Sequence, residues 1–141
     1  MEFIKDYSTI KICDLGSSPC DPTPFLDEIL NNTKSKIIGF EANKEEFVKL
    51  NDSENRKYYN YAIGDGEIHN LNICAIPGMS SFLKPNINYL KLFHGFEEWS
   101  KILKTIPIKT KKMDNLNEKF DFIKMDVQGF ESEIIKNGKN T

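Results

Sequence analysis

The sequence of 141 residues predicts an α/β domain with a mainly parallel sheet and helices on both faces. Short apolar segments that end abruptly in a carboxylate occur at three places along the chain. The three carboxylates are Asp14, Glu41 and Asp126. After each of them comes a segment with apolar residues at helical spacing. Strands that alternate with helices favour parallel pairing through right-handed crossovers.

The elements can be placed in order from their local patterns. Residues 10–13 alternate and then become apolar, which predicts the first strand, and a turn follows at residues 16–24. Asp21 as N-cap and Pro22 at the first helical position predict a helix that ends at Asn32. Further strands are expected at residues 36–41, 56–63, 68–73, 106–112 and 120–126, helices at 44–50 and 131–137, and one helical turn within 113–119.

Residues 77–105 have no clear strand or helix period. Aromatic residues are scattered through them, among them Tyr89, Phe93, Phe96 and Trp99. We expect a loop with short helical pieces that closes over the site and recognises an acceptor, because lids are drawn from such connecting segments. The alternative is that these aromatic side chains pack into the core.

Composition narrows the function. A formal net charge of −2 does not favour a nucleic-acid partner, and the lysines suit a solvated surface. The three cysteines fit no zinc spacing, so we expect no metal and ordinary thiols in a reducing cytoplasm. The first six residues lack the apolar run of a signal peptide, and no apolar segment approaches the ~20 residues of a membrane span.

The carboxyl ends of parallel strands meet at one edge of a sheet, where ligands bind, so the three acids suggest one shared site. Gly16 permits close approach of a ligand, and Asp14 either accepts a ligand hydrogen bond or only holds its own turn. Glu41 follows Asp14 by 41 − 14 = 27 positions. In nucleotide-binding α/β folds, such an acid accepts the two hydroxyls of a ribose, and the alternative is a surface glutamate.

The remaining candidate residues have weaker signals. Asp65 lies in a Gly-Asp-Gly turn after the third strand, where it serves the turn or accepts a hydrogen bond from adenine. Asp126 and Gln128 follow the fourth core strand, and helix capping by Asp126 is the alternative to a ligand contact. Glu131 suits the positive end of a helix better than catalysis. His69 and His94 have no obvious acid or nucleophile near them in the sequence.

The ordered set of motifs resembles the FkbM family of S-adenosylmethionine-dependent methyltransferases over nearly the whole chain. The motifs are residues 14–16 (DLG), 39–43 (GFEAN), 61–65 (YAIGD), 78–83 (GMSSFL), 113–116 (MDNL) and 124–131 (KMDVQGFE). The resemblance implies a Rossmann-like class I methyltransferase fold and S-adenosylmethionine as methyl donor. It also implies an oxygen nucleophile on a saccharide, polyketide or similar small-molecule acceptor.

The resemblance also implies roles for individual residues. Those expected to bind the cofactor are Asp14 and Gly16 at the methionine end, Glu41 and Ala42 at the ribose, Asp65 near adenine, and Asp126 and Gln128 near the methyl group. Asp126 is the candidate catalytic base. Ser80 and Ser81 fall where a loop approaches the site, and we expect them to contact the acceptor.

Two features depart from the family pattern. Cys20 stands where a second glycine often follows Gly16, in a proline-rich loop. The chain ends at Thr141, after the helix that follows Asp126, where the fold normally continues. We therefore expect one domain over residues 1–141 that lacks the last strands of the sheet and leaves an edge unpaired beside the fourth core strand.

Two other functions stay open at this stage. An NAD-dependent oxidoreductase would use the same sheet and Glu41, but no Gly-x-Gly-x-x-Gly follows the first strand to receive a pyrophosphate. A non-catalytic nucleotide-binding module would bind the cofactor without turnover.

Overall fold

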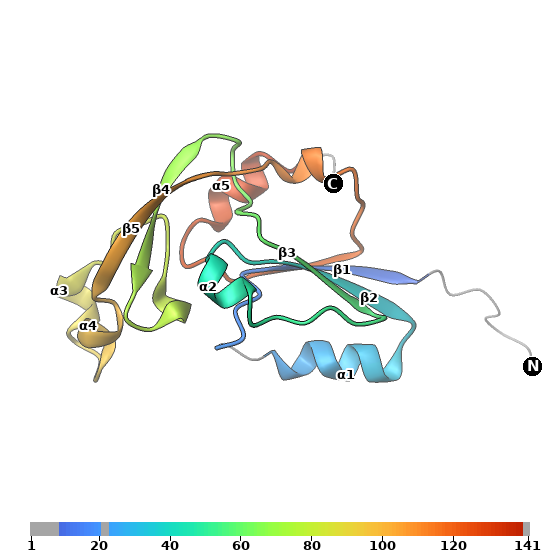
Figure 1. Cartoon of the computed structure of the whole chain (residues 1–141), viewed down its shortest axis with the longest axis horizontal. Coiled ribbons are helices and arrows are strands. Elements are labelled where there is room, and N and C mark those ends of the chain that lie inside the picture. Colours follow the sequence, from blue (N-terminus) through green and yellow to red (C-terminus); the bar gives the residue numbers. More distant parts are fainter. Residues whose placement is uncertain (1–8, 21–22, 140–141) are drawn as a thin grey trace, which may run out of the picture.

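The core of the protein is a four-stranded parallel sheet (Figure 1). The computed structural model describes residues 9–20 and 23–139. The sheet has the order β3-β2-β1-β6, and its strands are β1 (Ile10–Leu15), β2 (Ser35–Phe40), β3 (Arg56–Tyr59) and β6 (Phe122–Met125). All three pairings are parallel, with Asp14 opposite both Gly39 and Lys124. The predicted α/β class with a mainly parallel sheet is therefore confirmed.

Helices cover both faces of this sheet, as predicted (Figure 1). Helix α1 (Pro24–Asn32) buries Leu26 against Ile12 and Ile37 on one face. Helix α5 (Glu131–Lys136) buries Ile134 on the other face, in a cluster with Cys13. Successive side chains of a strand point to opposite faces. Ile12 of β1 therefore packs on the side of α1, and Cys13 packs on the side of α5.

Helix α1 begins at Pro24, with Thr23 as its N-cap residue. The expected capping pair, Asp21 and Pro22, lies outside the described residues. Proline at the first helical position suits a helix start, because its missing amide hydrogen has no partner there. The proline at the start of the helix is therefore Pro24, two residues after the Pro22 that the sequence suggested.

Strand β3 ends at Tyr59, four residues earlier than expected. The next residue, Asn60, turns its amide toward the β2–α2 connection, where Nδ2 donates to the carbonyl of Glu41 at 2.7 Å and to that of Ala42 at 3.3 Å. Helix α2 (Lys44–Phe47) follows that connection and is also shorter than expected. Its N-cap residue, Asn43, accepts a hydrogen bond from the amide of Glu45 at 3.0 Å.

An antiparallel hairpin, which we call the arm, extends from the sheet (Figure 1). It comprises residues 68–109: β4 (Ile68–Cys74), the 3₁₀ turn η1 (Pro77–Met79), α3 (Ile87–Leu90), α4 (Phe96–Trp99) and β5 (Ile102–Lys109). Helices α3 and α4 lie at the tip of the arm. Strand β5 begins four residues earlier than predicted, because residue 102 pairs with Cys74 at the far end of β4.

The chain reaches the edge strand β6 through a short 3₁₀ turn. The expected helical turn is present as η2 (Met113–Leu116), with Met113 buried. In the part of the chain that the structure describes, β6 pairs with β1 alone. A search of the same residues finds no helix that is long and apolar enough to span a membrane.

Candidate functional site

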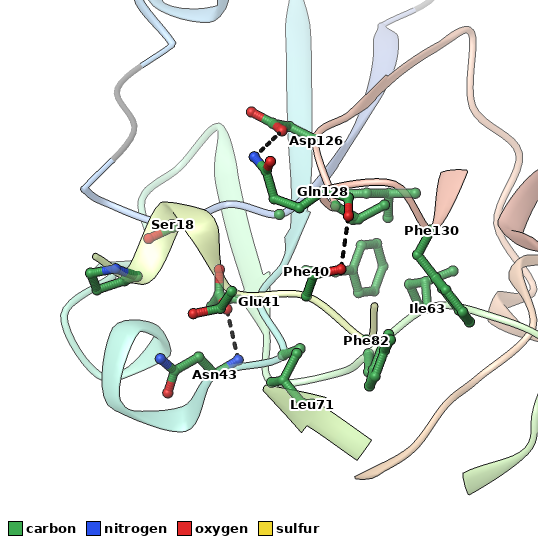
Figure 2. A pocket seen from close by; sticks show the side chains of 18 of the residues that line it. Ser18, Phe40, Glu41, Asn43, Ile63, Leu71, Phe82, Asp126, Gln128 and Phe130 are labelled. Carbon is green, nitrogen blue, oxygen red and sulfur yellow. Dashed lines mark hydrogen bonds between the residues drawn. The ribbon is translucent and has the colours of Figure 1, made fainter. Parts of the chain in front are cut away.

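A pocket of about 710 Å³, including the space at its mouth, lies at the carboxyl ends of the parallel strands (Figure 2). Five connections build its wall: those after β1, β2, β3 and β6, and the start of the arm. Its lining residues are Leu15, Gly16, Ser18, Phe40, Glu41, Ala42, Asn43, Tyr61, Ala62, Ile63, Leu71, Pro77, Gly78, Ser80, Ser81, Phe82, Asp126, Val127, Gln128 and Phe130.

The electrostatic character of the pocket is acidic. Glu41 and Asp126 are the carboxylates in its lining, and none of the lining residues that the structure describes is a lysine, arginine or histidine. Much of the remaining wall is apolar, with Phe82 and Phe130 in contact at 4.9 Å between ring centroids. The pocket therefore suits a ligand with apolar surface and positive charge better than one with phosphates.

Glu41 is the more deeply buried of the two acids in the pocket wall. It directly follows β2 and is 7% exposed. Its Oε1 accepts the Asn43 amide at 2.7 Å, which leaves Oε2 available to a ligand (Figure 2). Burial, and to a lesser extent the nearby charges of Glu46 and Asp14, raise the pKa of Glu41 to about 7. A carboxyl that resists ionisation in a pocket wall is typical of functional sites.

Gly16 brings the first loop against the loop after β6. Its φ of +81° lies in the left-handed region, and a Cβ there would stand 2.1 Å from the carbonyl oxygen of Asp126. The amide of Asp126 in turn donates to the carbonyl of Leu15 at 2.9 Å. Only glycine fits this approach, which places Gly16 and Asp126 together in the pocket wall.

The loop after β6 holds a strained residue. Gln128 has φ +55° without being glycine, and its Nε2 donates to Oδ1 of Asp126 at 2.8 Å (Figure 2). Glu131 Oε1 accepts the amides of Val127 and Gly129, both at 3.2 Å. Such outliers cost about 1–3 kcal/mol and concentrate at functional sites. Glu131 therefore serves this loop, in line with the non-catalytic role expected of it.

Asp14 does not line the pocket, contrary to the expected contact with the cofactor. Its carboxylate points to Lys124 on the neighbouring strand, with Nζ 3.1 Å from Oδ1, and both side chains are largely buried. The hydroxyl of Ser17 donates to Oδ2 at 2.8 Å. Asp14 therefore holds its own turn, which is the alternative that the sequence left open.

Asp65 also lies outside the pocket lining, contrary to the expected place near adenine. Its Oδ1 accepts the Glu67 amide at 2.9 Å and contacts Nε2 of His69 at 2.8 Å. The bond from the Glu67 amide is the main cause that lowers the pKa of Asp65. The strand after the turn carries His69 back to Asp65, so this histidine has an acid partner, although none was expected from the sequence.

The two serines expected to contact an acceptor both line the pocket, but they differ in what their hydroxyls do. Ser80 Oγ accepts the amide of Cys74 at 3.1 Å and keeps its own hydrogen for another partner. Ser81 Oγ donates to the carbonyl of Gln128 at 2.8 Å and accepts the Leu83 amide at 2.9 Å. Ser80 can therefore still donate to a ligand, whereas Ser81 is engaged within the protein.

Comparison with known families assigns the chain. The model of the methyltransferase FkbM domain matches residues 16–141, most of the chain. The protein belongs to the FkbM methyltransferase family. No curated protein and no solved structure matches it. The pocket described above is thus at the ligand-binding end of the sheet in a methyltransferase domain.

The arm of this FkbM domain meets the pocket only through its start. Leu71 of β4 and most of residues 77–82 contribute to the wall, whereas no residue of α3 or α4 does. Phe93, Phe96 and Trp99 instead contact each other at the tip, with Trp99 42% exposed. Among the described residues, the part of 77–105 that reaches the site is therefore much shorter than the predicted lid, and the tip aromatics join neither buried core cluster.

This division predicts the response of the FkbM domain to S-adenosylhomocysteine, the demethylated product of the expected donor. Amides of residues 78–82 should gain protection from hydrogen exchange, because this segment borders the pocket. Amides of residues 87–99 should exchange at the same rate with and without the ligand. Ligand-induced protection across α3 and α4 would instead restore the lid that the sequence suggested.

The thiols of the FkbM domain supply no obvious nucleophile or metal site. Cys13, Cys20 and Cys74 are unpaired, and no group of three or more metal-ligating side chains occurs in residues 9–20 and 23–139. Burial, followed by the charge of Asp14, raises the pKa of Cys13 to about 12. Because the thiolate is the reactive form, Cys13 is inert packing in the centre of β1.

Proposed function

We propose that this FkbM domain transfers a methyl group from S-adenosylmethionine to an oxygen of a small-molecule or saccharide acceptor, and that it works in the cytoplasm. The observation that carries the proposal is the charge of the pocket. Two carboxylates and no described basic side chain line it. This lining favours a sulfonium cation and disfavours phosphates, since like charges in a poorly solvated site repel.

The residues of the pocket fit the cofactor. Glu41 Oε2 and the backbone around it can accept the two hydroxyls of a ribose, and Ala42 leaves room for the adjoining base. Gly16 lets the ligand approach the backbone at the methionine end. Phe82 and Phe130 give the apolar surface that an adenine ring requires. Asp14 and Asp65 are left out of this proposal, because their carboxylates have partners inside the protein.

S-adenosylmethionine, when bound, supplies a methyl carbon that its positive sulfur has already activated. The protein then has to align an acceptor hydroxyl with that carbon and keep water away. The Asp126 carboxylate, oriented by Gln128 Nε2, borders the pocket and is our candidate for taking the hydroxyl proton. Ser80 Oγ can donate a hydrogen bond to another oxygen of the acceptor, as a saccharide would present.

An NAD-dependent oxidoreductase is the less favoured alternative. A pyrophosphate brings two negative charges, and the pocket offers it carboxylates and a loop with a single left-handed glycine. A module that binds the cofactor without turnover would make the same contacts with it as the proposed enzyme. An assay with methyl-labelled S-adenosylmethionine and extracts that contain candidate acceptors separates the two, because only the enzyme transfers the label.

Calorimetric titration of the protein with S-adenosylmethionine, S-adenosylhomocysteine and NAD tests the proposal. We expect micromolar binding of the first two, on the order of −8 kcal/mol, and at least tenfold weaker binding of NAD. Adenosine serves as a control for recognition of the nucleoside alone. Tighter binding of NAD than of S-adenosylhomocysteine would overturn the methyltransferase proposal.

A further inference from the structure

We propose that Ser81 is a positioning residue through which the arm holds Gln128, and with it the Asp126 carboxylate, in place at the pocket. The inference rests on the proposed function, because it takes Asp126 and Gln128 to border the cofactor. It departs from the expectation that Ser81 touches the acceptor.

Gln128 and Gly129 both have positive φ values, +55° and +98°. The left-handed conformation is unfavourable for a residue with a Cβ, so an isolated loop would leave it readily. The conformation matters to the pocket because it directs the Gln128 carboxamide back onto Oδ1 of Asp126, at 2.8 Å. Something outside the loop therefore has to fix the backbone at Gln128.

Two residues of the arm provide that restraint. The Ser81 hydroxyl donates to the carbonyl oxygen of Gln128 at 2.8 Å. Leu83 packs against Gly129 so closely that a Cβ on this glycine would lie 2.9 Å from Cδ1 of Leu83. Glu131 completes the restraint from within the loop by accepting the two flanking amides. The strained residue is thus held by one hydroxyl, one apolar contact and one carboxylate.

The arm itself is well anchored at this point. The backbones of Asn72 and Ser81 exchange hydrogen bonds of 2.9 and 3.2 Å. The Asn72 side chain donates to the carbonyl of Leu83 at 3.1 Å and accepts the hydroxyl of Thr105 on β5, also at 3.1 Å. Asn72 is 4% exposed, so these bonds are shielded from water. A continuous set of polar contacts, centred on the buried residues Asn72 and Ser81, therefore joins both strands of the arm to the Asp126 loop.

The test replaces Ser81 with alanine and measures affinity for S-adenosylhomocysteine by calorimetry. Loss of the hydroxyl should weaken binding about fivefold to tenfold. Without it the loop around Gln128 is less ordered in the free protein, and part of the binding free energy is used to order that loop. Ser100→Ala is the matched control: Ser100 is equally buried, its hydroxyl donates to the Glu97 carbonyl at 3.2 Å, and it lies at the tip of the arm. The control should lose similar thermal stability and keep full affinity.

A double-mutant comparison separates positioning from a direct contact. Gln128→Gly removes the carboxamide and the backbone strain together, so adding Ser81→Ala to it should weaken binding no further. Equal weakening by Ser81→Ala in both backgrounds would overturn the proposal, as would full affinity of the single Ser81→Ala variant. Wild-type protein that binds no S-adenosylhomocysteine at all would instead refute the proposed function.

If the alanine variant does not fold, the pair Ser81→Thr and Ser81→Val replaces it. The two side chains have the same shape, and only threonine retains the hydroxyl. Affinity close to the wild-type value for threonine and about fivefold to tenfold weaker for valine supports the proposal. Equal affinities of the two variants contradict it.

Discussion

Replacing Glu41 with glutamine is expected to stabilise the folded protein at pH 8 and, at the same time, to weaken binding of S-adenosylhomocysteine. Burial raises the pKa of Glu41 from 4.5 to about 7, so the folded protein binds more protons than the unfolded chain between these values. Stability therefore falls as the pH rises through this window. At pH 8 Glu41 is ionised in the folded protein, which then bears the full cost of burying this charge. Glu41→Gln should therefore gain about 2–3 kcal/mol in the free energy of unfolding.

At pH 4 the gain should vanish, because Glu41 is then neutral in both the folded and unfolded states. Urea unfolding at the two pH values measures the difference. Glu45→Gln is the matched control, since Glu45 lies nearby in the first turn of α2, is exposed and pairs with Lys104. It should bring no such gain at pH 8.

The same variant, Glu41→Gln, should bind S-adenosylhomocysteine about thirtyfold more weakly, a loss of about 2 kcal/mol. Unchanged affinity would make Glu41 a structural residue only.

Replacing Gly16 with alanine should have the largest effect on folding. The new Cβ would stand 2.1 Å from the Asp126 carbonyl oxygen, and alanine disfavours φ +81°. Either the first loop or the end of β6 must move, so we expect a loss of about 3 kcal/mol or more in stability, together with loss of cofactor binding. Chemical denaturation and calorimetry measure the two effects.

Gly78→Ala is the control for Gly16→Ala. Gly78 also lines the pocket, but its φ is not in the left-handed region, and the nearest atom to an added Cβ is Sγ of Cys20 at 3.7 Å. Its stability should stay within about 1 kcal/mol of wild type. A Gly16→Ala variant as stable as Gly78→Ala would show that the loop after β1 does not meet Asp126 as described.

Much of the sheet could be predicted from the sequence because the apolar segments that end in acids are local signals. Glu41 and Asp126 reach the same pocket for that reason, as parallel strands end at one edge. Asp14 also ends an apolar segment, but it does not line the pocket. Its partner Lys124 lies 110 residues away, on a strand whose register no local pattern specifies.

The arm was the least predictable part. Pairing of β4 with β5 joins residues more than 25 positions apart, so the start of β5 depends on a long-range register. The tip aromatics were expected over the site, but the arm reaches it only through Leu71 and residues within 77–82, and α3 and α4 pack on each other. The tie between Ser81 and Gln128, 47 residues apart, likewise leaves no sequence pattern.

The central claim is that the acidic pocket around Glu41 binds the methyl donor, and proton release on binding tests it most directly. With a pKa of about 7, Glu41 is about half protonated at pH 7. Two ribose hydroxyls that donate to its carboxylate would favour the charged form and lower that pKa. Titration with S-adenosylhomocysteine at pH 7, in buffers of different ionisation enthalpy, should show release of about half a proton that disappears in Glu41→Gln. Binding without proton release, or equal release by the variant, would contradict the account.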